Sequence, residues 1–206
     1  MPVWAWILIG IGAAVVVATV AWALAARRRS MQLQQHFGSE YNRVASRSSN
    51  RREAEAELAG RERRRERFQL RPLTANARER YAERWRRIQA DFVDSPGTAV
   101  TEGDALVSEV MRDRGYPMDD FDQRSADISV DHPDVVENYR EGHRLSLLSA
   151  RGEASTEDLR QALRHYRKLF DELVEASADE PTSAERREIG TREQDFAEPH
   201  MERTRR

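Results

Sequence analysis

Residues 155–175 read STEDLRQALRHYRKLFDELVE, and this stretch carries the strongest helical pattern in the 206-residue chain. Its apolar residues recur every three or four positions, the spacing of one helix face: Leu159, Leu163, Tyr166, Phe170, Leu173 and Val174. Ser155 stands at an N-cap position, and Asp158 completes a variant of the capping box. We therefore predict an amphipathic helix that ends near residue 176.

The same spacing extends back through residues 74–152 and predicts further helices. The expected inner stripes are Ala77, Tyr81, Trp85, Ile88 and Phe92; Val100, Leu106, Val107, Val110 and Met111; and Val135, Val136, Tyr139, His143 and Leu147. Thr74 and Ser95 are expected N-caps, and Gly115 and Gly152 are expected helix ends. No segment alternates with the period of two typical of strands. We predict an all-α fold in which residues 70–176 form a bundle of four main helices plus a short one.

The N-terminal segment contains no charged side chain up to residue 26. A helix over residues 3–26 reaches about 36 Å, enough to span a hydrocarbon core of about 30 Å. Arg27, Arg28 and Arg29 follow directly, so the positive-inside rule places the N-terminus outside and the remainder in the cytoplasm. The alternative is a cleaved signal peptide, but no basic residue precedes the apolar run. We predict a single-pass membrane anchor over residues 1–29.

An Arg-rich helical linker is expected between the anchor and the bundle, over residues 30–69. Leu33, Phe37, Tyr41 and Val44 give its first part a weakly apolar face, which Gly38 interrupts. A polar break follows at residues 46–50, and residues 51–68 form either an exposed helix or one strand of a coiled coil. Residues 177–206 have little apolar content, so we expect a disordered tail.

The net charge of −2 conceals two opposed blocks. Residues 27–90 hold 18 Arg and 8 Glu, a net charge of +10, whereas residues 91–180 hold 10 basic and 22 acidic groups, a net charge of −12. The basic block follows the anchor, so we expect contact with anionic lipid headgroups, made by Arg61, Arg63, Arg64 and Arg65. Nucleic acid is the alternative ligand, but the adjacent acidic block would repel phosphate.

The acidic segment 119–143 is the best place to look for a metal site, because oxygen-rich clusters suit Ca²⁺ or Mg²⁺. An EF-hand loop beginning at Asp120 fails, since Ser125 and Asp131 replace the required glycine and glutamate. The chain contains no cysteine and no recognised catalytic motif. We predict no enzyme, metal or cofactor. A metal-dependent or enzymatic module in this segment is the alternative, and Asp119, Asp120 and Asp122 are a candidate face for a protein partner.

Four stretches resemble an uncharacterised family of actinobacterial membrane proteins: residues 78–92 (RERYAERWRRIQADF), 109–121 (EVMRDRGYPMDDF), 130–140 (VDHPDVVENYR) and 152–160 (GEASTEDLR). The resemblance covers the helical domain and the layout of one anchor and an Arg-rich linker. It implies architecture and assigns no activity or catalytic residue.

These patterns together predict a membrane-anchored, cytoplasm-facing scaffold that positions a helical interaction domain near the bilayer. Its expected partners are anionic lipid and an unidentified protein. Gly10, Ala14 and Ala18 form one small-residue face, which would allow two anchors to associate. A membrane-tethered nucleic-acid adaptor that uses the Arg-rich segment is the third possibility.

Overall fold

The computed structural model describes the backbone of residues 3–179 and the side chains of residue 12, residues 16–25 and residues 27–177. Over this range the chain forms seven helices and no strand. It divides into two compact units, residues 1–63 and residues 64–206. The predicted all-α class is therefore confirmed for the described part of the chain.

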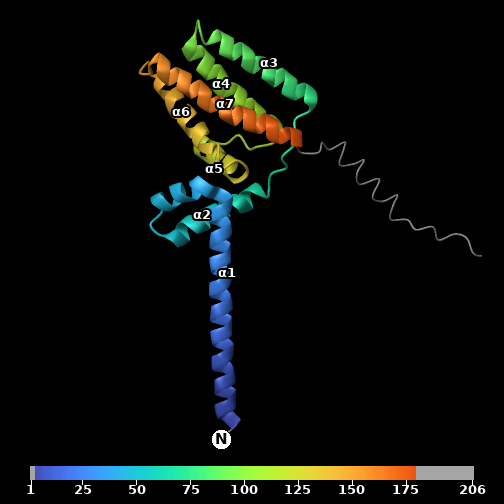
Figure 1. Ribbon diagram of the computed structural model, residues 1–206, viewed down its shortest axis with the longest axis vertical. Coiled ribbons are helices and arrows are strands. Elements are labelled where there is room, and N and C mark those ends of the chain that lie inside the picture. Colours follow the sequence, from blue (N-terminus) through green and yellow to red (C-terminus); the bar gives the residue numbers. More distant parts are fainter. Residues whose placement is uncertain (1–2, 180–206) are drawn as a thin grey trace, which may run out of the picture. The chain divides into compact units, whose positions relative to one another are not determined.

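The first unit contains α1 (Val3–Arg47) and most of α2 (Arg51–Arg65), the long helix and its partner in Figure 1. Gly38 interrupts α1 with φ 47° and ψ −118°, a conformation that side chains other than glycine rarely adopt. Residues 48–50 then separate the two helices. The helix is thus disturbed at Gly38 as predicted, and the break at residues 48–50 lies within the predicted residues 46–50.

Polar contacts join α1 to α2 on both sides of the kink. Ser30 donates a hydrogen bond to Glu55 (2.7 Å), and Arg61 pairs with the buried Glu40 (2.7 Å). Apolar side chains of both helices are also buried: Leu33, Phe37, Tyr41, Val44, Ala54, Leu58 and Ala59. The weakly apolar face predicted for residues 30–48 is therefore covered by protein.

The predicted transmembrane helix lies within α1, where many side chains of residues 1–15 fall outside the description. Among the residues that the structure describes, no helix has a stretch long and apolar enough to cross a bilayer.

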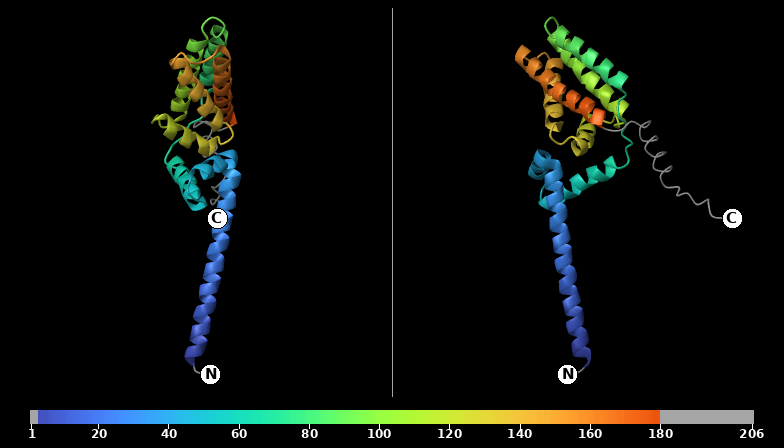
Figure 2. Two further views of the ribbon diagram at one scale, coloured as in Figure 1. Left: turned by 90° about the vertical axis from the view of Figure 1, so that its left-hand side faces the viewer. Right: turned by 45° about the vertical axis from the view of Figure 1, so that its right-hand side comes forward.

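The second unit is a bundle of four longer helices and one short helix, as predicted (Figure 2). Its helices are α3 (Ala75–Asp91), α4 (Pro96–Arg114), α5 (Phe121–Asp131), α6 (Val136–Ala150) and α7 (Thr156–Asp179). α7 packs against both α6 and α4, and α3 packs against α4. The helix with the strongest apolar stripe thus packs against two others, and α4 packs against three.

One continuous apolar core fills this bundle. The indole of Trp85 stacks on Phe170 with ring centroids 4.9 Å apart, which ties α3 to α7. Gly142 of α6 allows the fully buried ring of Tyr166 to approach, since a Cβ at this position would lie 3.2 Å from the ring. The stripes predicted for α3, α4 and α7 are buried or half-buried throughout.

The helix ends mostly follow the expected signals. The Thr74 hydroxyl accepts a hydrogen bond from the Ala77 amide, and Ser155 and Asp158 form the reciprocal capping box. Gly115 ends α4 with φ 93°. Ser95 precedes Pro96 as predicted, but its side chain makes no capping bond.

Three details differ from the sequence-based expectations. Val135, the first residue of the predicted stripe, lies before α6, which begins at Val136 because residues 133–135 form a turn. Leu147 is 47% exposed, and Leu145 is buried in its place. α7 continues to Asp179, past the expected end at 176, since the Ser177 hydroxyl is buried and accepts a hydrogen bond from the Leu73 amide. The rest of the tail predicted to be disordered, residues 180–206, lies outside the described residues.

Candidate functional site

The short helix α5 carries several of the acidic residues of segment 119–143. Asp120 is its N-cap, and its carboxylate accepts a hydrogen bond from the Gln123 amide at 2.8 Å. Asp127 and Asp131 lie further along the helix, and Asp127 is only 1% exposed. A buried carboxylate must be paired or hydrogen-bonded, since leaving it isolated costs several kcal/mol.

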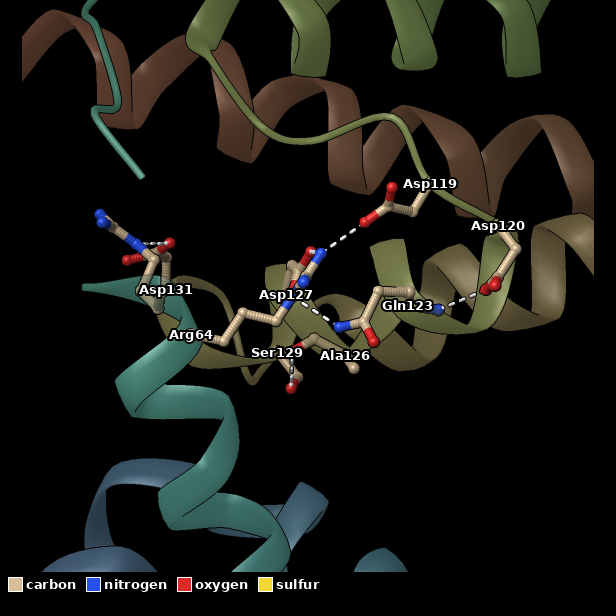
Figure 3. A network of polar contacts seen from close by, with 9 residues as sticks. Arg64, Asp119, Asp120, Gln123, Ala126, Asp127, Ser129 and Asp131 are labelled. Carbon is tan, nitrogen blue, oxygen red and sulfur yellow. Dashed lines mark hydrogen bonds and ion pairs between the residues drawn. The ribbon is translucent and has the colours of Figure 1, made fainter. Parts of the chain in front are cut away.

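Arginines from the end of α2 supply the counter-charges within the second unit (Figure 3). Arg64 donates from Nε to Asp127 at 2.9 Å, and its Nη2 pairs with Asp119. Arg65 donates from Nε to Asp131, which also accepts a hydrogen bond from the Tyr116 hydroxyl at 3.0 Å. Residues separated by 55 to 66 positions thus form one arginine–carboxylate cluster.

The cluster is electrostatically self-contained. The Gln123 amide nitrogen provides Asp127 with a second hydrogen bond at 2.9 Å. Hydrogen bonding to Asp127 raises the pKa of the Arg64 guanidinium, and burial, followed by the charge of Asp131, raises that of the Tyr116 phenol. In the described part of the chain, no group of three or more acidic or histidine side chains is arranged to hold a metal ion. The ion pairs of the cluster join the end of α2 to α5 and to the loop before it.

The residues predicted to contact lipid have different surroundings. Arg61 pairs with Glu40 and Glu57 within the first unit, and its side chain is 14% exposed. Arg64 and Arg65 belong to the cluster described above, whereas Arg63 is exposed. Arg27, Arg28 and Arg29, predicted to set the orientation, are also exposed.

The predicted partner face Asp119, Asp120 and Asp122 also divides by role. Asp119 pairs with Arg64, and Asp120 caps α5. Asp122 is exposed in the first turn of α5. The structure thus pairs one predicted arginine, Arg64, with one predicted carboxylate, Asp119, although 55 positions separate them in sequence.

A second polar group lies in the bundle core and includes His143. The Tyr139 and Tyr166 hydroxyls and the His143 Nδ1 atom are buried there. Burial raises the pKa of Tyr139 to about 12 and raises that of Tyr166 further, so both phenols stay protonated at neutral pH. His143 stacks on Phe121 with ring centroids 3.7 Å apart, and burial lowers its pKa. These phenols are therefore unsuited to act as bases at neutral pH.

A third feature is an open groove between α3 and α7, which the sequence analysis did not identify. Phe92 and Leu163 form its apolar floor, and four cationic side chains surround them: Arg160, Arg164, Arg167 and Lys168. Arg167 lies over the Trp85 ring and donates a hydrogen bond to Gln89. The signal was present in the sequence, because these cations are three or four positions apart and share one side of α7.

Comparison with known proteins found no match among protein-family models, curated proteins or solved structures.

Proposed function

We propose that this protein is a single-pass membrane protein that holds a helical interaction domain at the cytoplasmic face of the bilayer. The observation that carries the proposal is the apolar stretch of α1 that remains uncovered. Its described large side chains are more than half exposed: Val16, Val17, Val20, Trp22 and Leu24. A helix this apolar on its exposed surface is typical of a lipid environment rather than water.

The charges at the end of this stretch support the proposed orientation. Arg27, Arg28 and Arg29 are exposed and directly follow the apolar residues. Cytoplasmic loops carry an excess of such residues, which places the N-terminus outside and residues 30–206 inside. Near anionic lipid each contributes about 1 kcal/mol.

Fewer arginines are proposed to contact lipid than the sequence predicted. Arg61, Arg64 and Arg65 are engaged by carboxylates, so a contact with headgroups would compete with these ion pairs. Arg63 is exposed and is a better candidate. Association of two anchors through Gly10, Ala14 and Ala18 remains a proposal, because the side chains of positions 10 and 14 lie outside the described residues.

The proposal assigns the second unit a binding role and no reaction. Asp119, Asp127 and Asp131 are engaged by arginines, and its buried phenols are protonated at neutral pH. The likeness to uncharacterised actinobacterial membrane proteins supports the same layout of anchor, linker and helical domain.

The test is membrane extraction combined with topology reporters on the full chain. We expect the protein to stay in the membrane pellet after alkaline carbonate washing. A reporter fused after residue 206 should have cytoplasmic activity, and one fused before residue 1 should have activity on the outer side. Replacing Val16 and Val20 by Glu should release the protein, since charges at the centre of a span cost about 3 kcal/mol each.

The matched control replaces Gln32 and Gln34 by Glu, which adds the same charge outside the apolar stretch. These substitutions should leave the protein in the pellet. Release of the unmodified chain by carbonate, or external activity of the C-terminal reporter, would contradict the proposal.

A further inference from the structure

The groove between α3 and α7 is positively charged although it lies in the acidic part of the chain. Residues 91–180 contain 22 acidic and 10 basic side chains, and four of the ten basic ones line this groove. Arg160 pairs with Glu157, and Arg167 pairs with Asp171. Arg164 and Lys168 are exposed on the same side of α7. This concentration of positive charge favours an acidic ligand.

The floor of the groove is apolar, so a ligand that fills the groove should also offer apolar surface. Phe92 is half-buried, and Leu163 packs close to Gly103, where an added Cβ would lie 3.1 Å from its Cδ1 atom. Val93, the next residue after Phe92, is 83% exposed. A ligand that covers this surface would combine carboxylates with an aromatic or aliphatic side chain.

After α7 the chain contains a segment of this chemistry. Residues 193–202 read EQDFAEPHME, with four carboxylates, no Lys or Arg, and the apolar Phe196 and Met201. These carboxylates suit a groove in which Arg164 and Lys168 are exposed and Arg160 and Arg167 already pair with Glu157 and Asp171. The phenyl ring of Phe196 suits the floor formed by Phe92 and Leu163.

The connection is long enough for this segment to reach the groove. Lys168 and Arg160 lie 11 and 19 positions before the end of α7 at Asp179. These separations correspond to about 17 and 29 Å along a helix. The 14 residues from Asp179 to Glu193 can span up to about 46 Å. A tethered segment also has an effective concentration on the order of millimolar, so a modest intrinsic affinity is sufficient.

We infer that residues 193–202 of this chain bind in the groove between α3 and α7, with their carboxylates against Arg160, Arg164, Arg167 and Lys168. This inference involves only the second unit and does not depend on the proposed membrane anchor. Its consequence is that the groove is occupied by the protein's own C-terminal segment, and an external acidic partner would have to displace that segment.

The absence of cysteine allows a direct distance measurement on the full chain. Spin labels at Gln161→Cys, an exposed position of α7, and at Ala197→Cys report the distance between groove and segment by double electron–electron resonance. In neutral detergent micelles we expect a narrow distribution at short distance. Arg164→Glu with Lys168→Glu should abolish this short component, and adding Glu193→Arg with Asp195→Arg should restore it.

Three controls distinguish specific docking from a general charge effect, from misfolding and from contact between chains. Arg80→Glu with Arg112→Glu changes the net charge equally at exposed sites outside the groove and should leave the distribution unchanged. Phe196→Ala changes only the C-terminal segment, so it should weaken the short component without altering the bundle. It therefore tests docking even if the groove variants misfold. Mixed chains carrying one label each should show no short distance.

Three results would overturn the inference. The first is a broad distribution in the unmodified pair, or one insensitive to both the groove charges and Phe196. The second is a short distance between singly labelled chains, which would assign the groove to a second copy. The third is loss of the short component in Arg80→Glu with Arg112→Glu as well as in the groove variant, which would assign it to net charge rather than to the groove.

Discussion

Asp127 and Asp122 lie five residues apart in α5 but have opposite surroundings. Asp127 is buried and accepts hydrogen bonds from Arg64 and Gln123, whereas Asp122 is exposed. Asp127→Asn should lower the free energy of unfolding by about 2 kcal/mol, because a bond to a charged group contributes about 1.5–3 kcal/mol. Asp122→Asn, the control, should change it by less than about 0.5 kcal/mol. Denaturant titration monitored by circular dichroism measures both, and equal effects would contradict the role given to the cluster.

Gly142 and Gly97 offer a second residue-scale comparison. A Cβ at Gly142 would lie 3.2 Å from the fully buried ring of Tyr166, whereas one at Gly97 would meet only the Ser149 hydroxyl at 3.6 Å. Gly142→Ala should therefore destabilise the bundle by about 1 kcal/mol, because overpacking outweighs the better helix propensity of alanine. Gly97→Ala should be neutral or stabilise it by up to about 1 kcal/mol. Thermal denaturation of both variants tests this, and a stabilised Gly142→Ala would show that the ring has room to move.

At the element scale, the long helices were predictable and the short one was much less so. Leu159, Leu163 and Phe170 predict α7, because one apolar face at helical spacing is the pattern of an amphipathic helix and of no strand. α5 buries Ser125, Asp127 and Ser129 along with Ile128, so apolar periodicity is nearly absent from its sequence. Its burial depends on bonds from distant residues.

Dependence on residues distant in sequence also explains two further results. Leu147 was wrongly predicted to face the core in α6, and the arginine–carboxylate cluster was not predicted. Leu145, Leu147 and Leu148 lie close together in sequence, and only packing against α7 determines which of them faces inward. Arg64 has many carboxylates available to it in the sequence, and the tertiary fold alone selects Asp127 and Asp119. Local patterns predict elements, whereas pairings between charges depend on how the elements pack.

The kink in α1 depends on Gly38, and replacing this residue should disturb the contacts that follow it. Gly38→Ala forces a side chain into a conformation with φ 47°, which costs about 1–2 kcal/mol. We expect the contacts after the kink to weaken, including the ion pair between Glu40 and Arg61, so amide hydrogen exchange in residues 39–61 should become faster. Gly60→Ala is the control, because a Cβ there has only Arg63 within 4 Å. Unchanged exchange in Gly38→Ala would mean that α1 can straighten without loss.

At the scale of the whole molecule, the opposed charge blocks of the sequence are partly joined in the fold. Arg64 and Arg65 come from the basic block, and their partners Asp119, Asp127 and Asp131 come from the acidic block. In the second unit, the net charge calculated from sequence therefore overstates how much of each block is available to ligands. The α3–α7 groove is the opposite case, a basic surface inside the acidic block.

The stability of the protein should depend on pH, because several side chains have different pKa values in the folded and unfolded chain. Burial lowers the pKa values of His143 and His165 below the ordinary 6.5, so near and below that pH the unfolded chain binds more protons than the folded one. Lowering the pH from 7.5 to 5.5 should therefore destabilise the protein. The capping bonds from Ser155, which lower the pKa of Asp158, and the hydrogen bond from Arg144, which lowers that of Glu141, act in the same direction at more acidic pH.

The double variant His143→Gln with His165→Gln isolates the histidine contribution. Its unfolding free energy should fall less between pH 7.5 and 5.5 than that of the unmodified chain, because two groups that take up protons on unfolding are gone. At pH 7.5 both imidazoles are mostly neutral in either state, so the difference between the proteins at that pH measures packing and the contact between His165 and Asn138. At more acidic pH, carboxylates such as Asp158 and Glu141 destabilise both proteins in the same way. Identical slopes between pH 7.5 and 5.5 would show that the buried histidines take up protons as readily in the folded protein as in the unfolded chain.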